Sequence, residues 1–200
     1  MKNIIENERY KLEIFDDLDP TNPREFDNLG TMVCFHSRYI LGDETDLKSS
    51  DFSSWEELES YLYKIEKALI VIPIFMYDHS GLSVNTTGFS CPWDSGQIGF
   101  IYASKERIRN EYGYKRISKK LEEQVIELLC SEVDLYNDYL SGNVYSFTLT
   151  DKEKDEELDS SSGFYGTDCI ENGIFDYVSE YFTKAELEAL LWKTLTDTKQ

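Results

Sequence analysis

Cationic side chains are scarce in this chain, and they are unevenly placed. Lysine and arginine total 20 against 39 aspartates and glutamates, which gives a formal net charge of −19 over 200 residues. The stretch 103–120 holds seven of the cations and two acids, a local charge of +5, so the remaining 182 residues carry −24. Such an acidic field repels nucleic acid and attracts the proteins that bind it. We therefore expect a basic partner; the alternative is charge that serves solubility alone.

Histidine, cysteine and long apolar runs are also in short supply. The chain has two histidines and four cysteines, and no two cysteines form a CxxC pair. This spacing is typical of reduced thiols and gives little sign of a disulfide framework or a zinc site. The longest apolar run, 68–76, contains a proline and is far shorter than the roughly 20 residues that span a bilayer. Since the N-terminus also lacks a secretory signal pattern, we expect a cytoplasmic protein without a cofactor or a metal.

Apolar and aromatic residues are plentiful enough for a real core, at 40% and 14% of the chain. Short strand-like runs cluster with helical segments between them, which favours an α+β fold with a mixed or antiparallel sheet packed with helices. The expected strands are 10–15, 31–35, 68–77, 82–87, 97–103, 143–150 and 163–165. The expected helices start at 54, 104 and 118, with two more at 174–182 and 184–195. We expect one α+β domain over 1–169 and a helical appendage over 170–200, packed on the same domain.

The longest predicted helix, over about 118–140, has the clearest charge geometry. No lysine or arginine occurs between Leu121 and Leu140. Four carboxylates fall on one side of the helix, within about 60° of arc: Glu123, Glu127, Asp134 and Asp138. We interpret this row as a negative ridge for a partner, with an ordinary solvated helix face as the alternative. Glu132 falls on the apolar side, where a buried carboxylate needs a cationic or hydrogen-bonding partner.

Two acidic loops add to the predicted partner-binding surface. They contribute Asp43, Glu44 and Asp46 from the first loop, and Asp155, Glu156 and Glu157 from the second. Complementary charge of this kind mainly speeds encounter and sets orientation, so aromatic anchors such as Phe52 or Tyr136 are expected to hold the complex. The seven cations within 103–120 are expected to pair with the acidic faces of the same chain, or to orient a charged complex.

The segments around residues 77–81 and 89–100 are the most idiosyncratic in composition. Cys91, His79 and Asp94 supply the residue types of a thiol enzyme: nucleophile, base and orienting acid. However, no hydrolase signature accompanies them, and Pro92 disfavours a helix that starts at the cysteine and activates it. A metal site has too few good ligands here. The structural alternative is a glycine-rich turn region in which Trp93 fills a core.

These same segments carry a resemblance to a known family. The runs HSG (79–81), FSCPWDSGQIGFIY (89–102) and GFYG (163–166) resemble a family of uncharacterised proteins encoded by phages, plasmids and integrative elements of Gram-positive and gut bacteria. The resemblance covers roughly 26–166 and supplies no catalytic residues. It implies an accessory gene of a mobile element, and such genes often encode inhibitors of host defence.

Together, the charge and the resemblance predict a non-catalytic acidic inhibitor in the host bacterial cytoplasm. It is expected to bind the nucleic-acid-binding surface of a defence protein, such as a Cas nuclease or a restriction enzyme, in the manner of a DNA mimic. We expect neither direct nucleic-acid binding nor membrane association. The alternatives are a thiol enzyme that uses Cys91, His79 and Asp94, and a structural or regulatory module of the mobile element.

Overall fold

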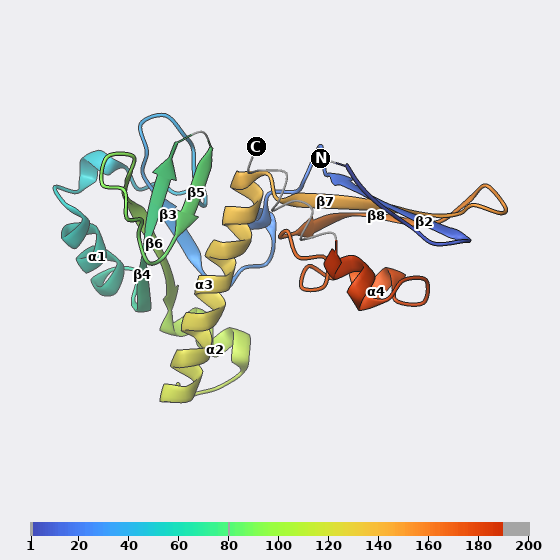
Figure 1. The fold of residues 1–200 in the computed structure, drawn as a ribbon. Coiled ribbons are helices and arrows are strands. Elements are labelled where there is room, and N and C mark those ends of the chain that lie inside the picture. The colour runs from blue at the N-terminus through green and yellow to red at the C-terminus, as the bar shows by residue number, and fades with distance from the viewer. Residues whose placement is uncertain (1, 80, 190–200) are drawn as a thin grey trace. The chain divides into compact units, whose positions relative to one another are not determined.

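A computed structural model of the chain describes residues 2–79 and 81–189 (Figure 1). It has an α+β fold with antiparallel pairing and a long helix, α3 (Lys119–Ser141), as the sequence predicts. The strands form two four-stranded sheets, where the sequence analysis expected one. In the described residues no helix combines the length and the apolar character needed to cross a bilayer. The expected helix at 184–195 is helical from 184 to 189, and its remainder lies outside the described residues.

The chain divides into two compact units with boundaries that differ from the expected ones. Residues 22–141 form one unit, and residues 1–21 together with 142–200 form the other. The expected split into 1–169 and 170–200 does not appear because the N-terminal hairpin pairs with a strand that follows residue 142. We call the two parts the central unit and the terminal unit, and each is described by itself.

The central unit is a sheet with a helix on each face. Its strand order is β3 (Thr31–Cys34), β6 (Ser95–Ser104), β4 (Ala68–Asp78) and β5 (Leu82–Asn85), all antiparallel. Helix α1 (Trp55–Lys64) covers one face and α3 covers the other (Figure 1). Helix α2 (Lys105–Tyr112) follows β6 directly, and two short 3-10 turns, Pro23–Glu25 and Ser49–Asp51, lie in the loops.

The two faces of this sheet have separate hydrophobic cores. Met32, Ile74 and Ile101 pack with α3, while Val33 and Phe100 pack with the Leu58–Leu62 stripe of α1. Neighbouring residues of one strand thus enter opposite cores, as the two-residue period of a strand requires. The sheet therefore fixes both helices and holds α3 with its apolar side inward.

Two local features of β4 and β6 follow from backbone chemistry. Pro73 lies within β4, but β5 pairs only with 75–78, so the proline lies where β4 has β6 as its one partner. The pairing of β4 with β6 also shifts register between Ile74 and Phe75, which marks a bulge. Gly99 is a site of close approach, since a Cβ there would lie 1.9 Å from the carbonyl oxygen of Val33.

The terminal unit is a second sheet with the strand order β1 (Lys2–Glu6), β2 (Tyr10–Asp16), β7 (Val144–Asp151) and β8 (Glu156–Tyr165). One of its faces is covered by the C-terminal segment with α4 (Ile174–Val178), whose Ile174 and Val178 are buried with Leu12 and Phe147. The sequence predicts a charged turn over 151–159, but strand β8 already begins at 156. An exposed edge strand needs no apolar alternation, which is why the pattern did not reveal it.

Candidate functional site

Helix α3 presents most of its predicted carboxylates to solvent. Glu123, Glu127 and Asp134 are exposed, and in the described residues no ion pair involves any of them. Their positions along the helix place the first and the last about 16 Å apart, at 1.5 Å per residue. We call these three residues the acidic ridge. Asp138 is half-buried and has an interaction of its own, so it is not counted with them.

The ridge is held rigidly because the opposite side of α3 is buried. Leu121, Val125, Leu129 and Val133 are at most 4% exposed in the core between the helix and the sheet. Two apolar residues of α3 are nevertheless partly exposed: Ile126 is 42% exposed and Leu128 is 37% exposed. A partner that approached the ridge would therefore meet carboxylates with some apolar surface beside them.

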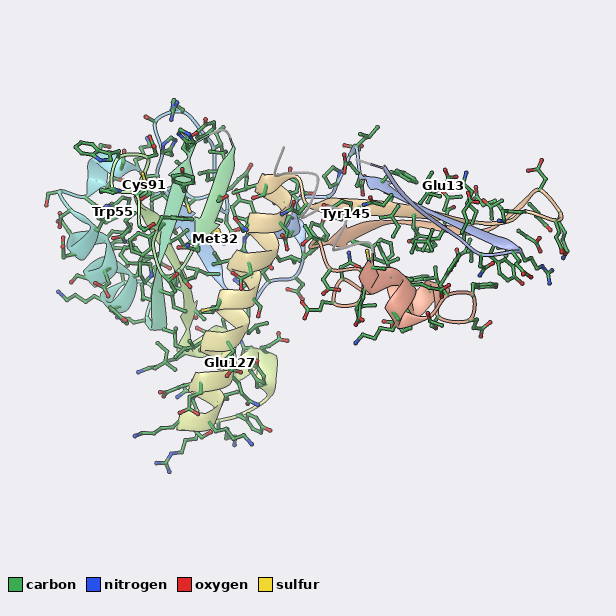
Figure 2. All side chains as sticks on the ribbon, in the orientation of Figure 1. Glu13, Met32, Trp55, Cys91, Glu127 and Tyr145 are labelled. Atoms are coloured by element: carbon green, nitrogen blue, oxygen red, sulfur yellow. The ribbon has the colours of Figure 1, made fainter. Side chains whose placement is uncertain are left out.

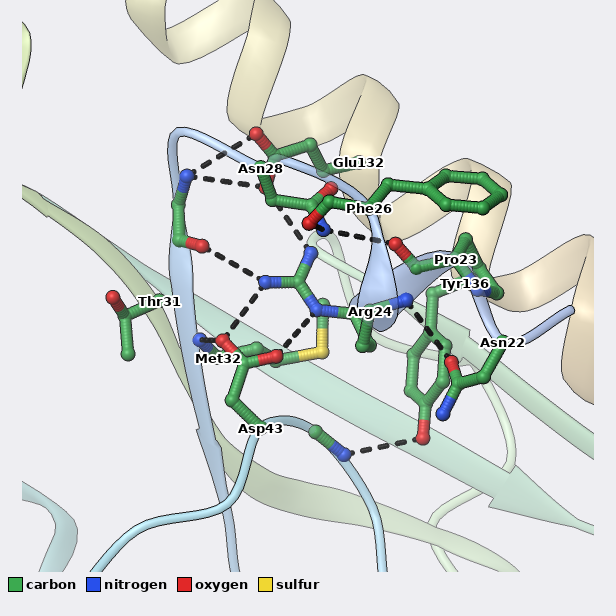
Figure 3. Close-up of polar contacts among 12 residues, drawn as sticks. Asn22, Pro23, Arg24, Phe26, Asn28, Thr31, Met32, Asp43, Glu132 and Tyr136 are labelled. Atoms are coloured by element: carbon green, nitrogen blue, oxygen red, sulfur yellow. Dashed lines mark hydrogen bonds and ion pairs between the residues drawn. The ribbon is translucent and has the colours of Figure 1, made fainter.

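Glu132 is the exception on this helix and has the partner that its burial demands (Figure 3). Its side chain is 8% exposed and lies 3.1 Å from Nη1 of Arg24, which is itself 4% exposed. It also accepts hydrogen bonds from the backbone N–H groups of Leu29 at 2.8 Å and Gly30 at 3.1 Å. Charged hydrogen bonds of this kind compensate the cost of burying the carboxylate.

Arg24 joins this carboxylate to one of the predicted site residues. Its Nε and Nη2 atoms donate to the two oxygens of Asp43 at 2.7 and 2.9 Å, and Nη2 also donates to the Gly30 carbonyl at 2.8 Å. Asp43 further accepts from the N–H of Met32 at 2.8 Å. The network thus locks the loop at 42–43 to α3 (Figure 3). Asp43 has a structural role and is removed from the predicted partner-binding set.

The two neighbours of Asp43 in that set have a different environment. Glu44 and Asp46 are exposed, and no ion pair in the described residues uses them. Their loop lines a groove of about 980 Å³. Trp55 and Phe35 also line this groove, and their rings are stacked with centroids 6.3 Å apart. The first acidic loop therefore places two exposed carboxylates beside an aromatic surface.

The second acidic loop is the tip of the β7–β8 hairpin in the terminal unit. Asp155, Glu156 and Glu157 are exposed and make no ion pair in the described part of the chain. Asp151, at the base of the tip, is 1% exposed and accepts from Arg9, which lowers the pKa of its carboxyl group. Of the ten predicted carboxylates, seven thus lie in the central unit and three in the terminal unit, and Asp43 is one that pairs with a cation of its own chain.

Cys91, His79 and Asp94 do come together, but in an order that does not suit thiol catalysis. The Oδ2 atom of Asp94 lies 3.5 Å from Nδ1 of His79 and 3.8 Å from Sγ of Cys91. A nucleophile and its base need direct contact, with the acid on the far side of the base. Here the carboxylate lies between them, and no hydrogen bond joins the thiol to the imidazole in the described residues.

The surroundings of this cluster are open. The His79 side chain is 64% exposed, and Trp93 is 91% exposed, so the tryptophan does not fill a core as the structural alternative proposed. A cavity of about 290 Å³ is lined by Asp94 and His36 among others. Within residues 2–79 and 81–189 no group of three or more histidine, cysteine, aspartate or glutamate side chains is arranged to hold a metal ion.

The thiols of Cys34 and Cys169 are unreactive near neutral pH. Burial raises the pKa of Cys34 to about 12, and the charge of Asp43 adds to the rise. Burial likewise raises the pKa of Cys169 to about 11, with a contribution from Asp168. Since the thiolate is the reactive form, neither residue is a nucleophile near neutral pH.

Comparisons with known proteins give no further guide. No protein-family model, curated protein or solved structure matches the chain. The family suggested by its sequence runs stays a prediction. The candidate site therefore depends on the residues alone.

Sequence reasoning missed Arg24, although a signal for it exists. It is the one cation between residues 12 and 37, in a stretch that is otherwise acidic or neutral. A lone cation and a carboxylate on the apolar side of a distant helix are complementary, and pairing them would have predicted the contact with Glu132. The same step would have assigned Asp43 to the fold before it was assigned to a partner surface.

Proposed function

We propose that the chain is a non-catalytic binding protein whose acidic ridge and acidic loops engage the nucleic-acid-binding surface of a basic partner. The observation that carries the proposal is the contrast between two sets of carboxylates. Asp43, Glu132 and Asp151 pair with arginines of their own chain. The ridge, Glu44, Asp46 and residues 155–157 are exposed and have no ion pair in the described residues. Free carboxylates on a rigid helix present a fixed negative potential at no reorganisation cost.

The biological setting of the proposal is an inhibitor of host defence in a bacterial cytoplasm. The resemblance to proteins of phages and other mobile elements supports this setting, and the acidic surface suggests how inhibition would work. A Cas nuclease or a restriction enzyme binds nucleic acid through arginine and lysine clusters, which carboxylates can occupy in place of phosphates. The rival hypothesis is a regulatory module of the mobile element itself. The two hypotheses predict different partners: a host defence protein for the inhibitor, and a protein of the element for the regulatory module.

Affinity capture with matched charge variants tests the proposal. The ridge variant carries Glu123→Lys, Glu127→Lys and Asp134→Lys. The control variant carries Glu8→Lys, Glu171→Lys and Glu180→Lys, three exposed positions without an ion pair in the described residues. Both variants change the net charge from −19 to −13, so total charge is held equal.

The expected result is a basic partner from nuclease-treated bacterial extract that wild type and the control variant retain and the ridge variant loses. Added duplex DNA should release the partner, because both ligands use one surface. Equal capture by the ridge variant, with its circular dichroism unchanged, would show that the ridge is only a solvated helix face.

A further inference from the structure

The seven cations of residues 103–120 form a surface that none of the proposed acidic contacts uses. They lie on α2, on the connection to α3 and in the first turn of α3: Lys105, Arg107, Arg109, Lys115, Arg116, Lys119 and Lys120. All seven are exposed. Figure 2 shows nitrogen-tipped side chains projecting from this end of the central unit, beyond Glu127. We call this set the basic surface.

The basic surface makes no ion pair with the carboxylates of the described residues. Over the described ranges, no ion pair includes any of its seven residues, although Arg9, Arg24 and Lys152 elsewhere do pair. Arg107 instead donates to the Thr31 hydroxyl and to the Asn28 carbonyl. The expectation that these cations pair with the acidic faces of the same chain therefore finds no support.

Helix stability does not explain the arrangement either. Lys119 and Lys120 occupy the first turn of α3, just after Ser118, whose hydroxyl accepts from the N–H of Leu121 at 3.2 Å. Cations at a helix N-terminus oppose the macrodipole and so destabilise the helix. An external anion against this turn would offset that cost. The position is therefore favourable for an anionic partner and unfavourable without one.

The total charge of the chain does not forbid such a partner. At an ionic strength of 0.15 M the Debye length is about 8 Å, so charges beyond that range are largely screened. Glu122 and Glu123 lie within one helical turn of Lys119 and Lys120 and so within that range. With them included, the stretch 103–123 holds seven cations and four acids, a local charge that is still +3. The expectation of no nucleic-acid contact was based on the net charge of the whole chain, −19.

We propose that the basic surface binds the phosphate backbone of nucleic acid. Long cationic side chains on two helical segments suit an extended polyanion better than a small ligand, and the exposed ring of Tyr114, 58% accessible, lies among them. The chain would then have an acidic region for a nucleic-acid-binding protein and a basic region for the nucleic acid itself. This goes beyond the proposed function and needs no partner protein to be tested.

The test is fluorescence polarisation with a labelled 20-base-pair duplex and the isolated full chain. The basic-surface variant carries Lys115→Glu, Arg116→Glu, Lys119→Glu and Lys120→Glu, which changes the local charge from +5 to −3. The control carries Lys48→Glu, Lys64→Glu, Lys67→Glu and Lys154→Glu, four exposed cations elsewhere. Both variants have a net charge of −27, so long-range repulsion is equal in the two.

The expected result is DNA binding by wild type and by the control, with a loss of more than about tenfold in the basic-surface variant. The dependence of log K on log salt should be no steeper than about −6 for wild type and should weaken by about 4 in that variant. No binding by wild type at 50 mM salt, or equal losses in the two variants, would overturn the proposal. Tighter binding of polyglutamate than of DNA would also overturn it, in favour of an acidic protein partner.

Discussion

Replacement of Glu132 by glutamine should destabilise the central unit, because it removes charge from a buried network that is fully hydrogen-bonded. The glutamine oxygen can still accept from the N–H of Leu29, 2.8 Å from the native carboxylate. Its amide nitrogen, however, then faces donors on Arg24 or Gly30. A hydrogen bond to a charged group contributes about 1.5–3 kcal/mol. With the added donor–donor conflict, we expect a loss of about 2–4 kcal/mol.

Urea unfolding followed by tryptophan fluorescence measures this loss. Trp55 packs in a core of the central unit and reports on that unit. Glu123→Gln is the matched control, since the same chemical change at an exposed position of the same helix should alter stability by no more than about 0.5 kcal/mol. If Glu132→Gln matches that control, the carboxylate does not stabilise the fold and the reasoning about its burial is wrong.

Three further predictions concern backbone packing, pH and thiol chemistry. Gly99→Ala should destabilise the sheet by about 1–3 kcal/mol, whereas Gly96→Ala on the same strand, with open space around its Cβ, should be neutral or slightly stabilising in urea unfolding. Because Arg9 lowers the pKa of Asp151 below its ordinary 3.8, the stability gained from the charged carboxylate is present above that pH and lost as pH falls through the folded-state pKa. The stability difference between wild type and Asp151→Asn should therefore shrink on acidification, and a constant difference from pH 6 to pH 3 would contradict this. Cys34, with a pKa of about 12, should resist iodoacetamide at pH 8 in the folded protein and react after unfolding, as judged by peptide mass mapping.

Local patterns predicted the helices of the fold better than its pairings. Helix α3 was found within a residue or so because its period, its Ser118 cap and its length are all local features. Apolar residues recur at helical spacing as far as Leu69, but helix α1 ends at Lys64, and Lys67 adopts a left-handed φ of 56° before β4 begins. The apolar, β-branched segment that follows forms strand β4, so the helical period does not continue into it.

Pairings that join distant segments were not predictable from one sequence. Strand β2 pairs with β7 across 129 to 141 residues, and the apolar period of neither strand indicates which strand is its partner. The contact of Arg24 with Glu132 spans 108 residues, and it changed the interpretation of Asp43 from surface to structure. The exposed carboxylates of α3 were predictable because they depend on one segment only: its helical wheel separates the polar side from the apolar side that is buried.

The most direct test of the binding hypothesis is competition between this chain and DNA for the captured partner. The affinity of the partner for the chain is measured by titration at rising concentrations of a duplex that the partner binds. We predict an apparent dissociation constant that rises linearly with duplex concentration, as for two ligands of one surface, and a ridge variant (Glu123, Glu127 and Asp134 to Lys) that binds too weakly to measure. An affinity that is unaffected by saturating duplex would contradict the proposal that these carboxylates occupy a nucleic-acid-binding surface.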